Sequence, residues 1–363
     1  MRPLPRGSLG IIGIVMSSTA KRVVQIDIAR AFAALAVVLI HICDPALDAS
    51  YHEHKIPLFY LSVLIVSRFA VPMFVVLSGM GLALSYRPNE TYLQFIRRRL
   101  SKLLPAYIAW TVVYSFAYHG GLVWKTPSFP TLGYNILTGN ACSHLYFVPR
   151  IIELYLLFPF IYKVLRTKIG WIASITVAVG LILARHQVHS LGQLGLISQI
   201  GSSLSWLVYF VTGIWLVQSE HHLLFRKPSY RLAASILLPV AMVGMIVHLR
   251  GITQSTFSVN TVTEYMKVYN IFYVPLLIAW ILGIQWTSPL VLKPLKQLAV
   301  QSYGLYLSHF LVLLAYRAVY SALGLPSPSI LLFTSSLVVA MVFCVILPES
   351  VRSLRTAKKV PAT

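Results

Sequence analysis

The chain has 363 residues, of which 57% are hydrophobic and only 11% are charged, and its mean hydropathy is +0.76. Soluble domains carry about 25% charged residues, so this composition excludes a soluble globular protein and indicates an integral membrane protein. The formal net charge of +21 would favour a nucleic-acid partner in a soluble protein. Here the basic residues fall in short runs between apolar segments, which membrane topology explains better, so we expect no nucleic-acid partner.

Apolar segments long enough to cross a membrane recur along the chain. About 20 helical residues, at ~1.5 Å each, span the ~30 Å hydrocarbon core. The sequence therefore predicts an all-α integral membrane protein, a bundle of about ten transmembrane helices. The expected spans are residues 27–47, 58–84, 103–120, 144–164, 170–186, 203–218, 231–249, 267–286, 298–320 and 329–347.

The distribution of Lys and Arg predicts the orientation of these spans, because cytoplasmic loops carry the excess of basic residues. With the amino terminus inside, every inside segment is basic and the outside loops are poor in Lys and Arg. Both termini are then cytoplasmic. We expect residues 1–24 to be a disordered or mis-annotated cytoplasmic leader, with Met1 and Met16 as alternative starts, 25–347 to be the membrane domain, and 348–363 a basic cytoplasmic tail.

The first span carries three ionisable residues, Asp27, Arg30 and His41. Arg30 and His41 are eleven positions apart, which is close to three helical turns, so both side chains project from one face. They are about 16 Å apart along the axis. Ionisable groups are expensive in hydrocarbon and normally face the bundle interior, where they indicate a functional site.

Other spans also contain buried charge. Arg68 and Arg150 lie deep enough to need a partner or a water-filled cavity, and Glu153 follows Arg150 at a spacing that allows an intrahelical pair. Glu153 therefore has two interpretations: it neutralises Arg150, or it orients an imidazole. Pro149 is expected to kink this helix beside His144. Arg317, at the outer end of its span, is expected to snorkel.

The link before the third span concentrates the basic residues Arg97, Arg98, Arg99 and Lys102. They are either a topology anchor that touches anionic lipid or a site for a phosphorylated ligand.

Ser78 and Gly79, late in the second span, favour close helix packing, with passage of a ligand chain as the alternative. His309 is interpreted as site lining or as a direct catalyst. Neither a GxSxG, P-loop, HExxH nor CxxC motif is present, so the sequence predicts no metal site.

Five segments taken in order, IDIARAFAALAVVLIH, SRFAVPMFVVLSG, FIRRRLSKLLPAY, HLYFVPRIIELYLLFP and SYGLYLSHF, resemble acyltransferase family 3, the membrane O-acyltransferases. The resemblance covers roughly residues 25–347, and its most specific element is Arg30, ten intervening residues and His41. It implies transfer of an acyl group, most often acetyl, from cytoplasmic acyl-CoA to a hydroxyl of a cell-envelope glycan or lipid-linked sugar, in the inner (cytoplasmic) membrane. Where many members have Arg-x-x-Arg, this chain has Arg99 and Lys102, which keeps the charge but loses one bidentate fork.

With that resemblance, our hypothesis makes His41 the general base, since an imidazole titrates near operating pH. Asp27 or Glu153 would hold its tautomer. Four basic residues would bind the phosphates of acetyl-CoA beside Ser78: Arg30, Arg98, Arg99 and Lys102. The residues expected to bind the acceptor or stabilise the oxyanion are Arg68, Arg150, His309 and His144.

An exporter of a glycan or lipid-linked sugar is the alternative, because ten spans with buried charges also fit a transporter. The sequence shows neither an inverted repeat nor matching broken helices, which count against it. The expected partners are the lipid bilayer and the glycan acceptor, and a homo-oligomer is compatible with the sequence.

Overall fold

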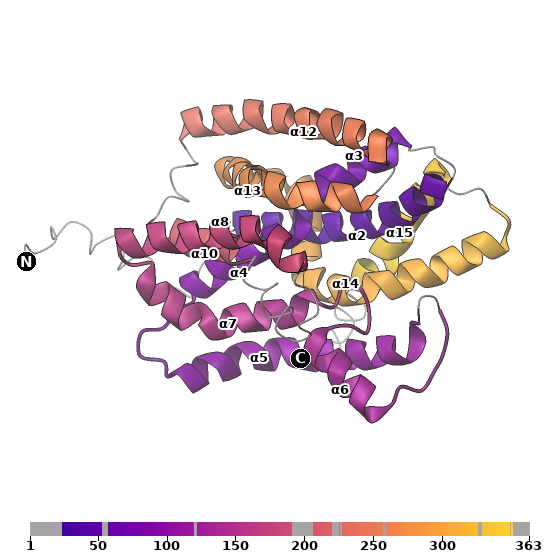
Figure 1. Cartoon of the computed structure of the whole chain (residues 1–363), viewed down its shortest axis with the longest axis horizontal. Helices are drawn as coiled ribbons and strands as arrows, with labels where there is room; N and C mark the ends of the chain where they lie inside the picture. Colours follow the sequence, from indigo (N-terminus) through magenta and orange to yellow (C-terminus); the bar gives the residue numbers. More distant parts are fainter. Residues whose placement is uncertain are drawn as a thin grey trace, which may run out of the picture.

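The computed structural model describes residues 24–52, 57–119, 122–190, 206–219, 225, 227–256, 259–325, 329–348 and 350. These residues form helices joined by short turns, so the described part of the chain is all-α as predicted (Figure 1). The expected leader, apart from Val24, and the carboxy-terminal tail, apart from residues 348 and 350, lie outside the described residues.

Each predicted span overlaps a helix or a pair of consecutive helices. In chain order these are α2 (Val24–His52), α3 (Leu58–Ser67) with α4 (Ala70–Leu84), α5 (Tyr92–Ala117), α7 (Phe147–Val164), α8 (Lys168–Ser190), α10 (Leu207–Gln218), α12 (Pro228–Thr256), α13 (Val259–Gly283), α14 (Pro289–Ala322), and α15 (Ile330–Met341) with the π-helical turn Val342–Ile346. Four segments of the described chain are long and apolar enough to cross a membrane: Val24–Asp44, Leu58–Leu84, Pro228–Ile252 and Pro289–Ala322. Shorter apolar helices accompany them, and together they support a multi-pass membrane protein.

Two helix starts differ from the prediction for local reasons. α5 begins at Tyr92, about three turns before the expected span, because Thr91 and Gln94 form a reciprocal capping box that satisfies its first amides. α6 (Phe129–Thr138) was not predicted; Ser128 caps its start and Gly139, at φ 79°, ends it in the left-handed conformation that glycine adopts without strain.

Prolines account for two further differences. The predicted span 58–84 is broken after Ser67, where Pro72 in the first turn of α4 supplies no amide to the carbonyl of Arg68. The kink expected at Pro149 is wrong: Pro149 lies in the first turn of α7, where the missing N–H would have no helical partner. His144 consequently lies in the preceding turn and not on the helix.

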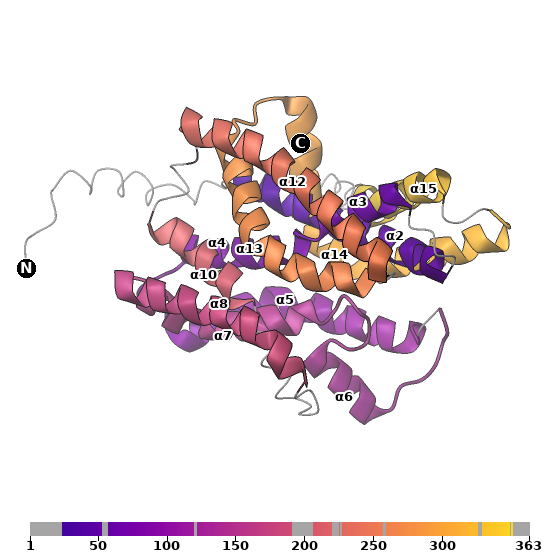
Figure 2. The same cartoon turned by 45° about the horizontal axis from the view of Figure 1, so that its top comes forward.

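α2 is the central helix of the bundle. It packs against α3, α4, α13, α14 and α15, and 72% of its spanning residues are buried, against 22% for α12. Figures 1 and 2 agree on this arrangement: α12 lies over α13 at the periphery, whereas α2 runs through the middle with α5 and α7 beyond it. The helix that carries Arg30 and His41 therefore faces protein on several sides.

α4 packs along α10 through two glycines. A methyl group on Gly79 would clash with the backbone of Phe210, and one on Gly213 would clash with the backbone of Val76. Close packing of helix backbones through small residues is typical of membrane bundles. This confirms the packing interpretation of Gly79.

We expect Gly79→Ala to destabilise the protein by about 1–3 kcal/mol, because the backbone of α10 must move to admit the methyl group. The measurement is thermal unfolding of the purified protein in detergent. Gly81→Ala is the matched control on the same helix, since the space around Gly81 is open. Equal stability of the two variants would contradict the packing account.

Candidate active site

Three histidines from separate parts of the chain meet inside the bundle. His41 comes from α2, His309 from α14 and His144 from the turn before α7. The ring centres are 5.1 Å apart for His41 and His309, 5.0 Å for His144 and His309, and 5.9 Å for His41 and His144. His309 is fully buried and His144 is 4% exposed. The sequence predicted each residue as a candidate, and the structure brings all three together.

Backbone contacts hold His309 in one tautomer. Its Nδ1 lies 2.9 Å from the carbonyl oxygen of Leu305, which can only accept, so Nδ1 carries the proton. Nε2 then presents a lone pair and has no hydrogen-bond partner among the described residues. In its neutral form His309 can therefore accept a proton at Nε2 but cannot donate one there.

The hydroxyl of Tyr114 is inserted into the backbone of α14 beside His309. It donates to the carbonyl of Leu307 at 2.9 Å and accepts from the amide of Leu311 at 3.1 Å. In a regular helix these two groups bond to each other across one turn, and here the Tyr114 hydroxyl bonds to both of them. The turn that carries His309 is thus set by a side chain from α5.

His144 is fixed through its carbonyl and its ring. The Tyr306 hydroxyl donates to the His144 carbonyl oxygen, and the ring packs edge to face against Tyr114, with centres 5.2 Å apart, and more nearly parallel to Phe310. Across the described ranges, groups of three His, Cys, Asp or Glu side chains arranged to hold a metal ion are absent. We call His41, His144 and His309 the histidine cluster; the rings of Tyr114, Tyr306 and Phe310 pack against it.

Arg68 has the partner that its position required, the partly buried carboxylate of Asp44. Its Nη2 lies 2.8 Å from Oδ1 of Asp44, and Asp44 is one helical turn after His41 on α2. Asn270 of α13 donates to the Arg68 carbonyl at 3.1 Å. The ion pair places a guanidinium close to His41 without leaving an isolated charge in the bundle.

A cavity of about 290 Å³ lies between α2, α4, α5, α7 and α14. Its polar lining includes three predicted donor-site residues, Arg30, Ser78 and Lys102, and its apolar wall includes Ile151. Tyr306 also lines it, and this ring lies 5.5 Å from that of His144. The cavity thus extends from Arg30 and Lys102 to Tyr306, which packs against His144 of the histidine cluster.

The structure places the remaining basic candidates in different surroundings. Arg99 donates to the Ser85 hydroxyl and lies over the Phe95 ring at 5.8 Å. Tyr155, a cavity residue, lies within electrostatic reach of Arg99 and contacts Ser78. Arg99 therefore lies beside the cavity although it does not line it.

Arg98 does not reach the cavity, because Glu90 binds it. Its Nε lies 2.7 Å from Oε1 of Glu90, and Nη2 contacts Oε2. The hydrogen bond from Arg98 lowers the pKa of the Glu90 carboxyl, so the pair remains ionised at neutral pH. The structure thus shows Arg98 joining the α4–α5 turn to α5, and its contact with the donor phosphates stays a prediction.

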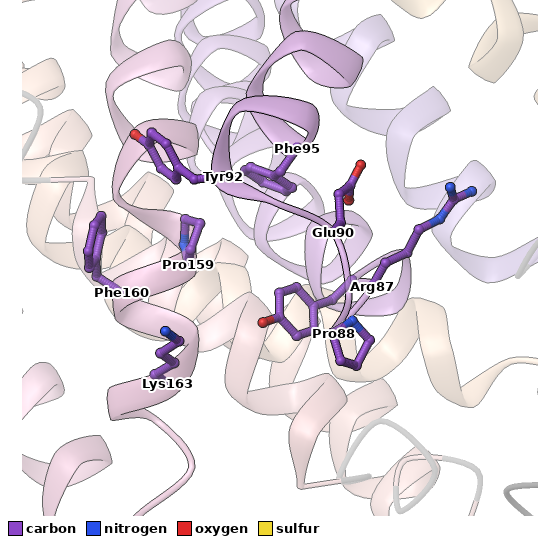
Figure 3. Close-up of a pocket in the computed structure, with 9 residues that line it drawn as sticks. Arg87, Pro88, Glu90, Tyr92, Phe95, Pro159, Phe160 and Lys163 are labelled. Carbon is purple, nitrogen blue, oxygen red and sulfur yellow. The ribbon is translucent and has the colours of Figure 1, made fainter.

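A second cleft, of about 260 Å³, opens beside this turn. Figure 3 shows the rings of Tyr92, Phe95 and Phe160 around it and the Lys163 side chain pointing toward it, while the Arg87 guanidinium points away. The charged residues of its lining are Lys163, Arg87 and Glu90, and Glu90 is bound by Arg98. Aromatic surfaces beside an ammonium group suit a flat ring and an anion.

The two carboxylates expected to orient His41 are bound elsewhere. Asp27 lies 3.2 Å from Arg30, and fourteen residues of helix, about 21 Å, separate it from His41. Glu153 lies 2.7 Å from Arg150, whose side chain is 6% exposed, so the neutralising interpretation of Glu153 is the one the structure shows. Arg150 does not line the described cavities.

A histidine cluster approached by a cation-lined cavity combines groups that can move a proton with groups that can bind an anion, as group transfer requires. The model of the acyltransferase family 3 domain matches residues 23–348. The chain belongs to this family and is a membrane acyltransferase. The comparisons with curated proteins and with solved structures gave no significant match.

Several residues of the site were missed by the sequence analysis. Asp44 could have been found, because it follows His41 by three positions and so shares its helix face. Tyr155 and Tyr114 could not, since tyrosines are frequent in this chain and only the tertiary contacts distinguish these two.

Proposed function

We propose that this acyltransferase moves an acetyl group from cytoplasmic acetyl-CoA to a hydroxyl of a cell-envelope carbohydrate, free or lipid-linked. The observation that carries the proposal is the cavity that begins at Arg30 and Lys102 and ends at Tyr306, beside the histidine cluster. Cations suit the phosphates of the donor, and apolar walls suit its long, mostly uncharged arm.

The proposed topology is ten transmembrane helices with both termini in the cytoplasm. The proposed location is the inner (cytoplasmic) membrane. The end of the bundle with Arg99, Lys102 and Lys163 carries the basic runs, and the positive-inside rule orients it toward the cytoplasm. The donor would enter there, and the acceptor would approach from the opposite face.

Arg30, Arg99 and Lys102 would bind the donor phosphates. The nucleotide ring would lie in the cleft of Figure 3, on the aromatic surfaces next to Lys163. Arg99 lies between this cleft and the cavity, because it contacts Phe95 on one side and approaches Tyr155 on the other. One extended ligand could therefore occupy both spaces.

The proposed chemistry needs a general base and a cation that stabilises the oxyanion. The acceptor oxygen attacks the thioester carbonyl while His41 takes the hydroxyl proton. The tetrahedral intermediate then collapses and the C–S bond breaks; the CoA sulfur takes the proton from His41 and leaves as the thiol. Arg68, held by Asp44 near His41, is positioned better than Arg150 to stabilise the oxyanion. Tyr306 lines the cavity beside His144 whereas His41 does not line it, so the Tyr306 side chain would have to move for the thioester to reach His41.

Transfer of the acyl group distinguishes this proposal from sugar export. Membrane vesicles from cells that produce the protein would receive labelled acetyl-CoA, and their glycans would be analysed by mass spectrometry for O-acetyl groups. We expect ester-linked label that alkali removes. Glycan that crosses the membrane without gaining acetyl groups would support the exporter.

A further inference from the structure

Arg317 makes an interhelical contact that the sequence did not predict. Its Nη2 donates to the carbonyl oxygens of His41, at 2.5 Å, and Ile42, at 3.1 Å. The side chain is partly buried between α14 and α2, which pack extensively. The expected snorkelling is therefore wrong: the guanidinium binds the backbone of the central helix.

The His41 carbonyl needs this donor because of Pro45. In an α-helix the carbonyl of residue 41 accepts from the amide of residue 45, and proline has no amide hydrogen. A carbonyl left without a hydrogen-bond partner in the bilayer core is strongly unfavourable. Arg317 replaces the missing donor at the residue that carries the proposed general base.

The same arrangement occurs a second time in the bundle. Pro72 leaves the Arg68 carbonyl without its helical donor, and Asn270 supplies a hydrogen bond of 3.1 Å. In both cases the freed carbonyl belongs to an ionisable residue of the proposed site, His41 or Arg68. In both cases the donor comes from another helix. Side chains that re-satisfy backbone groups freed by proline are known in transmembrane helices.

We propose that Arg317 is a positioning residue: by binding the His41 carbonyl that Pro45 leaves free, it sets the backbone of this turn and thus the direction of the imidazole. The inference rests on the proposed function of His41. In this proposal Arg317 acts through the backbone of His41 and not by binding the substrate or the donor.

The test compares Arg317→Ala with the double variant P45A/R317A. The single change removes the donor, and we expect kcat to fall roughly 10- to 100-fold, because small misplacement of a catalytic group has effects of this size. KM for acetyl-CoA should stay within about twofold. Alanine at position 45 restores an amide to the His41 carbonyl, so the double variant should regain most of the lost kcat.

Hydrogen–deuterium exchange of the peptide spanning residues 36–47 gives a readout that does not depend on turnover. Exchange should be faster in Arg317→Ala and return toward the native rate in the double variant. Arg250→Ala, at an exposed arginine of α12, is the matched control and should change neither readout.

An unchanged kcat in Arg317→Ala, or a loss that Pro45→Ala does not reverse, would overturn the inference. If Arg317→Ala fails to fold, a folded and active double variant supports it and an unfolded one overturns it. If the wild-type protein transfers no acetyl group, the proposed function fails, and the exchange data alone decide whether Arg317 sets the turn at His41.

Discussion

Replacing His41 with glutamine is expected to lower kcat for acetyl transfer by about 10²–10⁴-fold, the usual contribution of a positioned general base. Glutamine keeps approximate size and polarity but cannot take up the hydroxyl proton. KM for acetyl-CoA should change little, because the donor phosphates are proposed to bind about 16 Å away, near Arg30. Initial rates with labelled acetyl-CoA would measure both constants.

The matched control for this variant is His248→Gln. His248 is an exposed histidine of α12 whose Nδ1 contacts the Tyr269 hydroxyl, far in sequence from the cluster. Its replacement should leave kcat unchanged. A His41→Gln protein that is folded and transfers acetyl groups at the native rate would remove the proposed base.

The second large effect is expected at the donor end of the cavity. Arg30→Ala should raise KM for acetyl-CoA by roughly 10- to 100-fold, because a hydrogen bond to a charged group contributes about 1.5–3 kcal/mol. The kcat at saturating donor should be largely retained, since the lost contact is made equally in the ground state and the transition state.

Arg97→Ala tests whether this effect is specific. Arg97 belongs to the same basic run as Arg99 but is exposed and does not line the described cavities. Removing it lowers the net charge as much as Arg30→Ala does. Equal KM values for the two variants would show that general electrostatic attraction, and not the cavity, binds the donor.

The helices and one half of the site follow from local sequence rules. Apolar length predicted where the helices of the described chain lie, and four of its segments are long and apolar enough to cross a membrane. The spacing of Arg30 and His41 predicted that both project from one face of the first helix. These inferences succeed because hydrophobicity and helical period act over one or two turns.

The rest depends on contacts between segments far apart in the chain. The meeting of His41, His144 and His309 is determined by how α2, α14 and the turn before α7 pack. The same applies to the insertion of Tyr114 into α14 and to the choice of Glu90 as the partner of Arg98. The spacing had placed Arg99 on the same side of the helix as Lys102, but it could not show that Glu90 binds Arg98.

The most direct test of the account is equilibrium binding of radiolabelled acetyl-CoA to the purified protein in detergent or nanodiscs. The account predicts saturable binding that unlabelled CoA competes away, that Arg30→Ala weakens roughly 10- to 100-fold, and that Arg97→Ala leaves nearly unchanged. Folded wild-type protein that binds no acetyl-CoA, or binds it equally well without Arg30, would show that the cavity between α2, α4, α5, α7 and α14 is not the donor site.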